Sequence, residues 1–289
     1  MGARICTFDC LYCEAGATEA LTTARKPYVP ADRLLAELAV WKAAGHAAPE
    51  AVTLGGLGEP CLNTECEAIL RGAKALFPAV PAAVLTNSSL LPDPDVREAL
   101  FAADIVLPSM DTLVEAEFSR LNRPHPDMRL AAIRQGLLDF RAGYAGRMFL
   151  EILLVAGVND TEENLALLRD FCRELAPDRV DVTTMSRPGA YPGVRAVSPA
   201  VRARFREALD AVPGPSVDSG HGPTALLTRA PENLDAVILA SVKRRPQTAA
   251  GLAAGLGVPL ACLEQALETL ARTGAVRREL LGHDIFYSG

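Results

Sequence analysis

The stretch Cys6-Thr7-Phe8-Asp9-Cys10-Leu11-Tyr12-Cys13 places three cysteines within eight residues near the start of the chain. Thiolates are the usual protein ligands of iron–sulfur clusters and common ligands of zinc. A structural zinc site is closed by four ligands, whereas a catalytic metal site keeps one position open. This run has no fourth cysteine, and the nearest histidine is His46. The spacing therefore favours a cubane cluster with one iron left open for a ligand.

Two other interpretations of the three cysteines have to be kept beside the cluster. Bacterial ferredoxins use the spacing C-x2-C-x2-C, which differs from the C-x3-C-x2-C found here. A zinc-stabilised scaffold protein is one alternative, and three unrelated structural cysteines are another. An iron–sulfur redox sensor would also use such a cluster, without being an enzyme.

Length and composition limit the kind of protein that this chain can be. The chain has 289 residues, 49% of them hydrophobic, which suits one large domain with a small one, or two ordinary domains. The sequence shows no export signal and no apolar run of the ~18 residues that a membrane span needs, so we expect no membrane partner. Seven cysteines in such a chain indicate a reducing compartment, and we expect a cytoplasmic protein.

A glycine-rich loop follows the first predicted strand after the cysteines. Residues 51–54 form a short apolar run with β-branched members, which predicts a buried strand. Gly55, Gly56 and Gly58 follow at once, and Glu59 with Pro60 closes the loop. Glycines allow positive φ angles and close approach of the backbone to a ligand. A plain turn remains the alternative for this loop taken alone.

Strands and helices alternate through the next 150 residues or so, which predicts a parallel sheet with helical crossovers. Asp160 and Glu163 have the spacing of a capping box at the start of one of these helices. The predicted strands are 51–54, 82–86, 105–107, 149–155 and 179–184, and the predicted helices are 64–77, 95–102, 126–144, 161–175 and 199–211.

Polar residues gather where these strands end. Because carboxyl ends of parallel strands meet at one edge of the sheet, we expect these residues to share one rim. They are the glycine loop, Thr86 with Asn87, Ser109 with Asp111, Asn159 with Asp160, and Arg187.

The cysteine spacing, with Tyr12 before the last cysteine, resembles the signature of radical S-adenosylmethionine (SAM) enzymes. The resemblance implies that Cys6, Cys10 and Cys13 carry a [4Fe–4S] cluster, whose fourth iron SAM chelates. It implies reductive cleavage of SAM to a 5′-deoxyadenosyl radical that abstracts hydrogen from a substrate. It also implies a one-electron reductant of the flavodoxin or ferredoxin type.

The resemblance extends to the predicted SAM site and fold. Gly-Gly-Leu-Gly-Glu-Pro at 55–60 is similar to the family's second motif, in which the backbone and the acidic residue, here Glu59, hold the SAM amino group. By the same resemblance Tyr12 lies near the adenine, and a partial (β/α)6 barrel is expected. The residues implied to bond the SAM carboxylate and ribose are Thr86, Asn87, Ser109 and Asp111.

Several stretches resemble the subgroup related to 4-demethylwyosine synthases, which modify a guanosine in tRNA. These are 53–60, 84–91, 106–111, 122–125 and 153–160. A tRNA substrate is disfavoured by the net charge of −6, since nucleic-acid binders usually carry a basic excess. No residue identifies the substrate; the candidates for contacting it are Arg123, His125, Asn159 and Arg187.

The first strand of such a barrel is missing from the sequence pattern. Residues 1–5 hold Gly2 and Arg4 and a single β-branched residue, so they do not resemble a buried parallel strand. Without that strand, the strand after the glycine loop would present an unpaired edge beside the cluster. We therefore expect the native protein to start further upstream, or this chain to be a shortened form.

The C-terminal part predicts a second domain. We expect a barrel domain over 1–212, a Pro- and Gly-rich linker over 213–223 that includes His221, and a winged-helix-like domain over 224–289. From residue 231 to the end, six basic residues balance six acidic ones, so this charge balance disfavours DNA binding and favours a protein contact or a lid role. The other cysteines are expected to be small buried residues; they are Cys61, Cys66, Cys172 and Cys262.

Overall fold

The structure is a computed structural model that describes residues 3–45, 49–210, 233–281 and 284–289. The chain divides into two compact units. The first comprises residues 1–10, 18–184 and 195–214, and the second comprises residues 11–17, 185–194 and 215–289. The predicted linker 213–223, with His221, lies outside the described residues.

The first unit is built on a five-stranded parallel sheet with strand order β3-β4-β5-β6-β7. The five strands predicted after the cysteine run are therefore confirmed, and so is the α/β class. Their bounds are β3 Val52–Leu54, β4 Ala82–Thr86, β5 Ile105–Pro108, β6 Arg147–Leu154 and β7 Arg179–Thr184.

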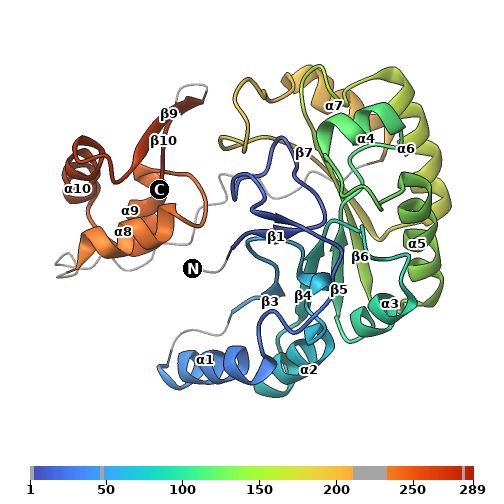
Figure 1. The fold of residues 1–289 in the computed structure, drawn as a ribbon, viewed down its shortest axis with the longest axis horizontal. Helices are drawn as coiled ribbons and strands as arrows, with labels where there is room; N and C mark the ends of the chain where they lie inside the picture. The colour runs from blue at the N-terminus through green and yellow to red at the C-terminus, as the bar shows by residue number, and fades with distance from the viewer. Residues whose placement is uncertain (1–2, 46–48, 211–232, 282–283) are drawn as a thin grey trace. The chain divides into compact units, whose positions relative to one another are not determined.

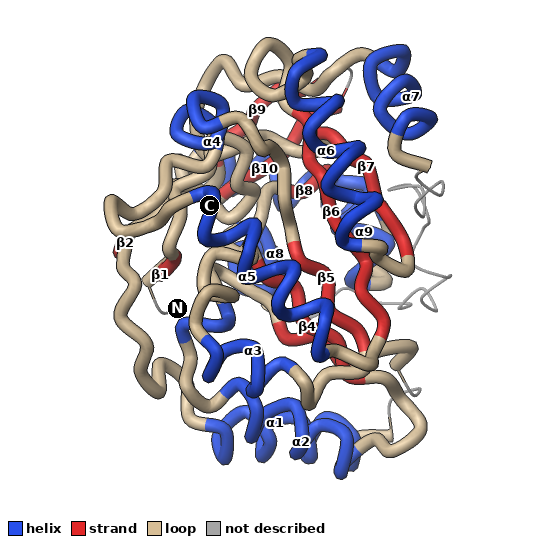
Figure 2. The backbone as a smooth tube through the Cα atoms, turned by 90° about the vertical axis from the view of Figure 1, so that its right-hand side faces the viewer, coloured by secondary structure: helices blue, strands red, loops and turns tan. Residues whose placement is uncertain are grey.

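Helices cover one side of this sheet, as Figures 1 and 2 show for α3, α5 and α6. Alternate residues of β6 and β7 point toward the helices, and they are almost all apolar and buried, which gives the unit its core. The helices are α1 Ala31–Ala43, α2 Cys66–Leu76, α3 Pro94–Leu100, α4 Glu115–Leu121, α5 Leu130–Gly143, α6 Glu162–Leu175 and α7 Pro199–Ala208, with a 3-10 turn at Pro60–Leu62.

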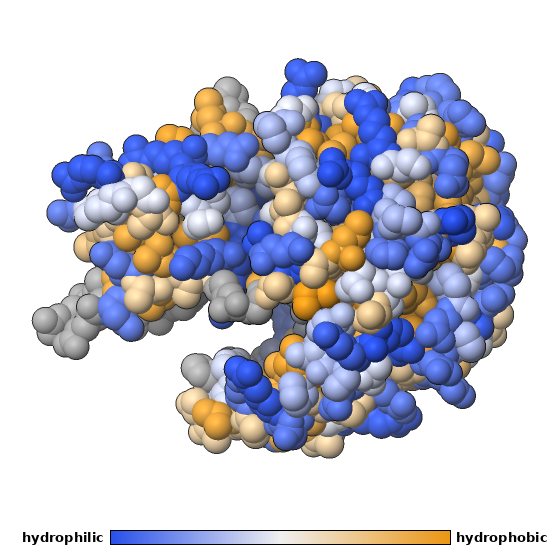
Figure 3. All heavy atoms as spheres, in the orientation of Figure 1, coloured by the Kyte–Doolittle hydropathy of each residue, from blue (hydrophilic) through white to orange (hydrophobic). Residues whose placement is uncertain are grey.

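The polar surface over these helices is seen in Figure 3, where charged and apolar side chains are interspersed. Isolated apolar residues such as Phe101 and Leu167 are exposed, which is normal for a protein surface. Within the described residues, none of the helices combines the length and the apolar character that crossing a bilayer requires.

Three local predictions are wrong. The helix predicted from residue 126 begins at Leu130, after a loop, and α4 was not predicted at all. The capping box is not formed, because Thr161 caps α6 by accepting a hydrogen bond from the Asn164 amide. Asp160 instead accepts from the Gly157 amide, 2.8 Å away.

The strand predicted as buried before the glycine loop is also only half-buried. β3 lies at the edge of the sheet, and Thr53 at its centre is exposed. The nearest preceding strand, β1 (Ile5–Cys6), pairs with β2 (Ala20–Leu21) in a separate two-stranded sheet. β1 meets the loop after β3 at a bridge between Ile5 and Gly58. The strand after that loop, β4, pairs with both β3 and β5, so the unpaired edge expected there is wrong.

The second unit contains three helices and a three-stranded antiparallel sheet of order β8-β10-β9. The helices and the hairpin expected from the sequence are present, although β8 was not expected. Leu263, Leu267 and Ile238 form its core together with Tyr287. The bounds are α8 Leu234–Val242, β8 Gln247–Thr248, α9 Ala249–Leu256, α10 Leu260–Arg272, β9 Arg277–Leu281 and β10 Asp284–Ser288.

Candidate functional site

Two of the three cysteines in the N-terminal run face amide groups of the first unit. The Asn87 Nδ2 lies 3.5 Å from the Cys6 Sγ, and the Asn122 Nδ2 lies 3.6 Å from the Cys10 Sγ. None of the seven cysteines of the chain is in a disulfide. N–H groups aimed at sulfur stabilise thiolates and tune iron–sulfur clusters, so this surrounding suits cysteines that act as ligands.

The segment 122–125 holds the cysteine run in place. The Asp9 amide donates to the Asn122 carbonyl over 3.0 Å, and the His125 amide donates to the Thr7 carbonyl over 2.8 Å. The Arg123 guanidinium pairs with the Asp9 carboxylate at 3.1 Å. Arg123 has a φ of 46°, a left-handed backbone conformation that side chains rarely adopt. The predicted substrate residues Arg123 and His125 therefore lie beside the cysteines, and their contact with substrate stays a prediction.

Glu59 is almost completely buried, and its carboxylate is surrounded by donors. The Thr86 hydroxyl donates to Oε1 over 2.7 Å, the Cys61 amide donates to the same oxygen, and the Asn87 amide donates to Oε2 over 2.8 Å. Burial raises the pKa of Glu59, and these hydrogen bonds oppose the rise. The predicted site residues Glu59, Thr86 and Asn87 thus come together. The buried Glu59 carboxylate is suited to pair with a positively charged group.

Gly58 shows why the loop before Glu59 needs a glycine. The Ile5 carbonyl accepts a hydrogen bond from the Glu59 amide at 3.1 Å, which draws β1 against the loop. A Cβ on Gly58 would stand 1.9 Å from the Ile5 carbonyl oxygen, far inside van der Waals contact. The glycine therefore allows the strand that leads to the cysteines to lie directly on the loop.

Asp111 connects the ends of β5 and β6. Its Oδ1 accepts from the Leu153 amide at 2.9 Å, and its Oδ2 accepts from the Asn122 Nδ2 at 3.2 Å. The Ser88 hydroxyl donates to the Ser109 carbonyl at 2.8 Å, so the Asn87 loop and the Ser109 loop touch. The predicted rim residues Asp111, Ser109 and Asn87 are therefore brought together.

Asn159 is fully buried, and its amide bonds only to the backbone. Its Nδ2 donates to the carbonyls of Asp111 and Leu153, and its Oδ1 accepts from the Val155 amide at 2.7 Å. A side chain without exposed surface can position the rim loops. Asn159 therefore holds the rim loops together, and its contact with substrate stays a prediction.

Tyr12, Cys13 and Arg187 belong to the second unit. There the Arg187 guanidinium pairs with the Glu14 carboxylate at 3.0 Å. A Cβ on Gly189 would meet the Leu11 carbonyl oxygen at 2.8 Å, so the two loops of this unit approach closely. Tyr12 and Arg187, predicted separately for the adenine and for the substrate, thus lie on two loops that contact each other.

Within the described residues, no group of three or more His, Cys, Asp and Glu side chains is gathered closely enough to hold a metal ion. Cys6 and Cys10 belong to the first unit and Cys13 to the second. The fit of the cysteines to a cluster therefore depends on their chemistry, on the eight-residue run that joins them, and on the amide donors at Cys6 and Cys10.

The other cysteines separate into buried and exposed residues. Cys61, Cys66 and Cys172 are buried as expected, and burial raises the pKa of Cys66 and of Cys172 to about 12. Such thiols stay protonated and are poor metal ligands. The prediction for Cys262 is wrong, because its side chain is exposed. Leu263 and Leu267 of α10 fill the core, which turns the neighbouring Cys262 outward.

Glu151 and Asp181 are candidate site residues that sequence reasoning missed. They are direct neighbours on β6 and β7, at matching register positions. Burial, Asp181 and Asp111 raise the pKa of Glu151 to about 7, and Arg179 lowers it. The sequence feature that could have indicated them is a single acidic residue inside each of the two predicted strands.

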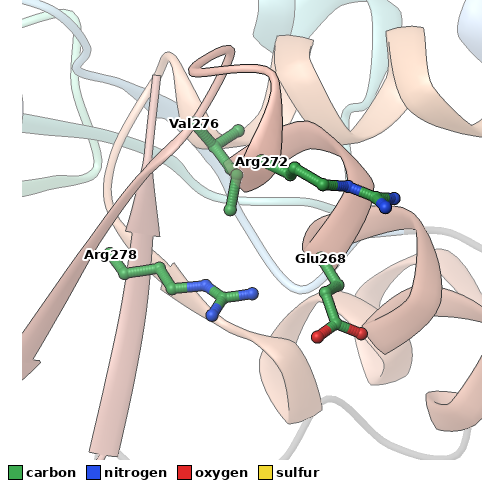
Figure 4. Close-up of a pocket in the computed structure, with 5 residues that line it drawn as sticks. Glu268, Arg272, Val276 and Arg278 are labelled. Atoms are coloured by element: carbon green, nitrogen blue, oxygen red, sulfur yellow. The ribbon is translucent and has the colours of Figure 1, made fainter.

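The second unit has a hollow of about 650 Å³ on the side of α10 and β9 (Figure 4). Figure 4 shows the Arg278 and Arg272 guanidinium groups on either side of it, with the Glu268 carboxylate below. The remaining lining residues are Ala271 and Val276. Its mixed charges agree with the balanced composition of this part of the chain.

Known proteins similar to this chain fall into two named groups. A protein named GTPase Obg from Brachyspira hyodysenteriae is 26% identical over 99% of this chain, which covers 42% of that protein. A UPF0026 protein from Synechocystis sp. is 33% identical over 63% of this chain, which covers 67% of that protein. The chain thus spans between 42% and 67% of the length of these relatives. No family model matches the chain.

The fold is shared with a solved structure. The crystal structure of a radical SAM methyltransferase from Sphaerobacter thermophilus superposes with a TM-score of 0.55 at 20% identity. The alignment covers 73% of this chain and 62% of that one. At this identity the likeness establishes the fold of the parallel-sheet unit and leaves the chemistry to the site.

Proposed function

The chain belongs to the UPF0026 family, and we propose that it is a radical SAM enzyme with one [4Fe–4S] cluster on Cys6, Cys10 and Cys13. When bound, the cluster and SAM supply a 5′-deoxyadenosyl radical for hydrogen abstraction, after an electron arrives from a flavodoxin- or ferredoxin-type donor. The observation that carries the proposal is the cysteine run with amide donors at Cys6 and Cys10.

The protein's part in this chemistry begins with the thiols. In a reduced chain, Asn87 and Asn122 place N–H groups where they favour the ionised sulfur. The Asp9–Arg123 ion pair and the bond from His125 to the Thr7 carbonyl limit the movement of the run. A ligand loop that is ordered in advance loses less entropy when it binds its metal.

Glu59 is suited to the amino group of SAM. A buried carboxylate with a raised pKa gains from a nearby ammonium, which would offset its desolvation. The glycines of the loop before it are exposed, so their backbone groups are accessible to a ligand. By the family resemblance, Tyr12 is the residue proposed for the adenine. The residues proposed for the carboxylate and ribose hydroxyls are Thr86, Asn87, Ser109 and Asp111.

For the finer assignment, we propose the subgroup related to wyosine synthases, on the stretches quoted above, with the substrate left open. The second unit is proposed to be a winged-helix-like domain that contacts another protein, on its three helices and three-stranded sheet. Its balanced charge supports neither DNA nor tRNA as its main partner.

The test is anaerobic reconstitution of the full chain, followed by iron analysis of single cysteine variants. We expect about four irons per chain, and loss of iron in Cys6→Ala, Cys10→Ala and Cys13→Ala. Cys61→Ala, Cys172→Ala and Cys262→Ala are the matched controls and should keep their iron. Eight irons in the wild type, or retention by all three ligand variants, would contradict the single cluster.

Glu59 is tested separately through SAM binding. Glu59→Ala should weaken the affinity for SAM, measured by equilibrium dialysis of reconstituted protein, while the visible spectrum of the cluster stays unchanged. An unchanged affinity would mean that the glycine loop does not bind the SAM amino group.

A further inference from the structure

The face of the sheet that points away from the helices carries its own polar group. Residues paired across parallel strands point to the same side, and the register aligns Ser109, Glu151 and Asp181 in one row across β5, β6 and β7. Leu85 points to the same side and is 38% exposed, although its neighbours Val84 and Thr86 are buried. This inner face is therefore less completely covered than the helix face.

Asp181 on this face has only half of its carboxylate satisfied. The Arg179 guanidinium donates twice to Oδ2, from Nε at 2.9 Å and from Nη2 at 2.7 Å. The same guanidinium lies 3.9 Å from the centre of the Phe149 ring, which fixes its position. The other oxygen, Oδ1, is buried and has no hydrogen-bond partner, in a residue that is only 7% exposed.

Glu151 is the residue opposite Asp181 on the neighbouring strand β6. Its side chain is half-buried, and the structure gives it neither an ion pair nor a hydrogen bond. Buried polar atoms in folded proteins nearly always have a partner, so a missing donor is expected at this point. Two carboxylates beside one guanidinium also leave negative charge uncompensated.

We propose that Glu151 and the Asp181 Oδ1 form a binding site for a cationic N–H donor, a primary ammonium group of a small molecule. An ammonium carries three donors and one positive charge, so one group could satisfy both carboxylates. Arg179 keeps Asp181 oriented toward the site.

An ammonium fits better than a metal ion or a neutral ligand. A metal ion would want a third ligand beside Glu151 and Asp181, and the other acid that acts on Glu151, Asp111, is committed to the Leu153 amide and to Asn122. A neutral ligand would leave the charge of the pair in place. The pKa of Glu151 is about 7, because burial, Asp181 and Asp111 raise it and Arg179 lowers it. A carboxyl with this pKa ionises readily when a cation binds beside it.

The position of the pair relates it to the proposed chemistry. Leu153 follows Glu151 by two residues, and its amide bonds to the rim residue Asp111. The pair therefore lies one pleat, roughly 7 Å, below the rim on the inner face. If the proposed function holds, this position makes Glu151 and Asp181 the anchor of an amine-bearing substrate. Binding of an ammonium group by the pair needs neither the cluster nor SAM.

The experiment is a carbon-13 NMR titration of the full chain labelled at glutamate side-chain carboxyl carbons, without cluster or SAM. Glu151→Gln identifies the Glu151 signal by its loss, and Glu163→Gln, which changes an exposed glutamate of α6, is the charge-matched control. If Glu151→Gln does not fold, Glu151→Asp removes the same signal and keeps the acid. The probes are methylammonium chloride and, at equal ionic strength, tetramethylammonium chloride, which has no N–H donor.

We expect methylammonium to lower the apparent pKa of Glu151 saturably, from about 7 to about 6 or below. Tetramethylammonium should leave it within the error of the titration, and Asp181→Asn should abolish the methylammonium response. Equal responses to both salts, no response to either, or a tighter response to magnesium chloride would each overturn the proposal. Because SAM cleavage is measured separately, failure here and failure of the proposed function are distinguishable.

Discussion

Glu151→Gln should change how the stability of the first unit depends on pH. In the folded chain the pKa of Glu151 is raised from 4.5 to about 7, chiefly by burial, with Asp181 and Asp111 adding to the rise. A carboxyl whose pKa is raised on folding binds more protons in the folded state. Its contribution to stability is therefore complete below pH ~4.5 and is lost as the pH rises through about 7.

The size of this effect follows from the pKa difference. Each pKa unit corresponds to about 1.4 kcal/mol, so ionised Glu151 costs about 3 kcal/mol relative to the protonated form. Glutamine at this position does not titrate, and other acids contribute equally to both proteins. The free energy of unfolding of the variant minus that of the wild type should then increase by about 3 kcal/mol between pH ~4.5 and pH ~8.

The assay is urea unfolding of both proteins across this pH range, followed by circular dichroism. Glu163→Gln, at an exposed position of the first turn of α6, is the control and should give a profile parallel to the wild type. Parallel profiles for Glu151→Gln and the wild type would show that the Glu151 carboxyl is well solvated. The reasoning about a desolvated pair on the inner face would then be refuted.

Three further predictions concern the loop, the cysteine run and the second unit. Gly58→Ala should strongly lower the soluble yield and the melting temperature, because the added Cβ would stand 1.9 Å from the Ile5 carbonyl oxygen. Gly55→Ala is the control and should be tolerated, since its Cβ would meet its nearest atoms at 3.7 Å. Equal effects of the two substitutions would refute the close approach at Gly58. Asn122→Ala should lower the free energy of unfolding in urea by about 1–3 kcal/mol, because the Asp111 carboxylate loses a buried donor. Because the variant also removes the N–H group that faces the Cys10 sulfur, the reduction potential of a reconstituted cluster should become more negative. An unchanged potential would show that Asn122 does not act on the cluster. The full chain should show no binding to duplex DNA at physiological salt in a fluorescence anisotropy titration, where non-specific binders reach roughly 10⁻⁴ to 10⁻⁶ M, and salt-sensitive binding would contradict the charge argument.

The strands and the rim were predictable because they depend on local pattern. Strands buried by helices contain continuous apolar residues, and the polar loops follow at their carboxyl ends, so the five strands β3 to β7 and their parallel arrangement could be inferred. The same pattern indicated that Glu59, Thr86 and Asn87 would meet. Glu59 and Asn87 are 28 residues apart along the chain, but the parallel sheet brings the ends of β3 and β4 together.

What the sequence could not predict depends on distant contacts. The segment 122–125 supports the cysteine run through backbone hydrogen bonds to Thr7 and Asp9, which no side-chain pattern encodes. Helix α4 is only seven residues long and has no side-chain cap, so it lacked a recognisable start. Glu151 and Asp181 looked like isolated acids in apolar strands, and only the register shows that they are neighbours.

The most direct test of the central claim is the anaerobic incubation of reconstituted wild-type protein with SAM and dithionite, with 5′-deoxyadenosine measured by liquid chromatography and mass spectrometry. We expect 5′-deoxyadenosine and methionine to appear in equal amounts with the wild type and to be absent with Cys10→Ala. A wild-type protein that carries a full cluster and forms no 5′-deoxyadenosine would contradict it.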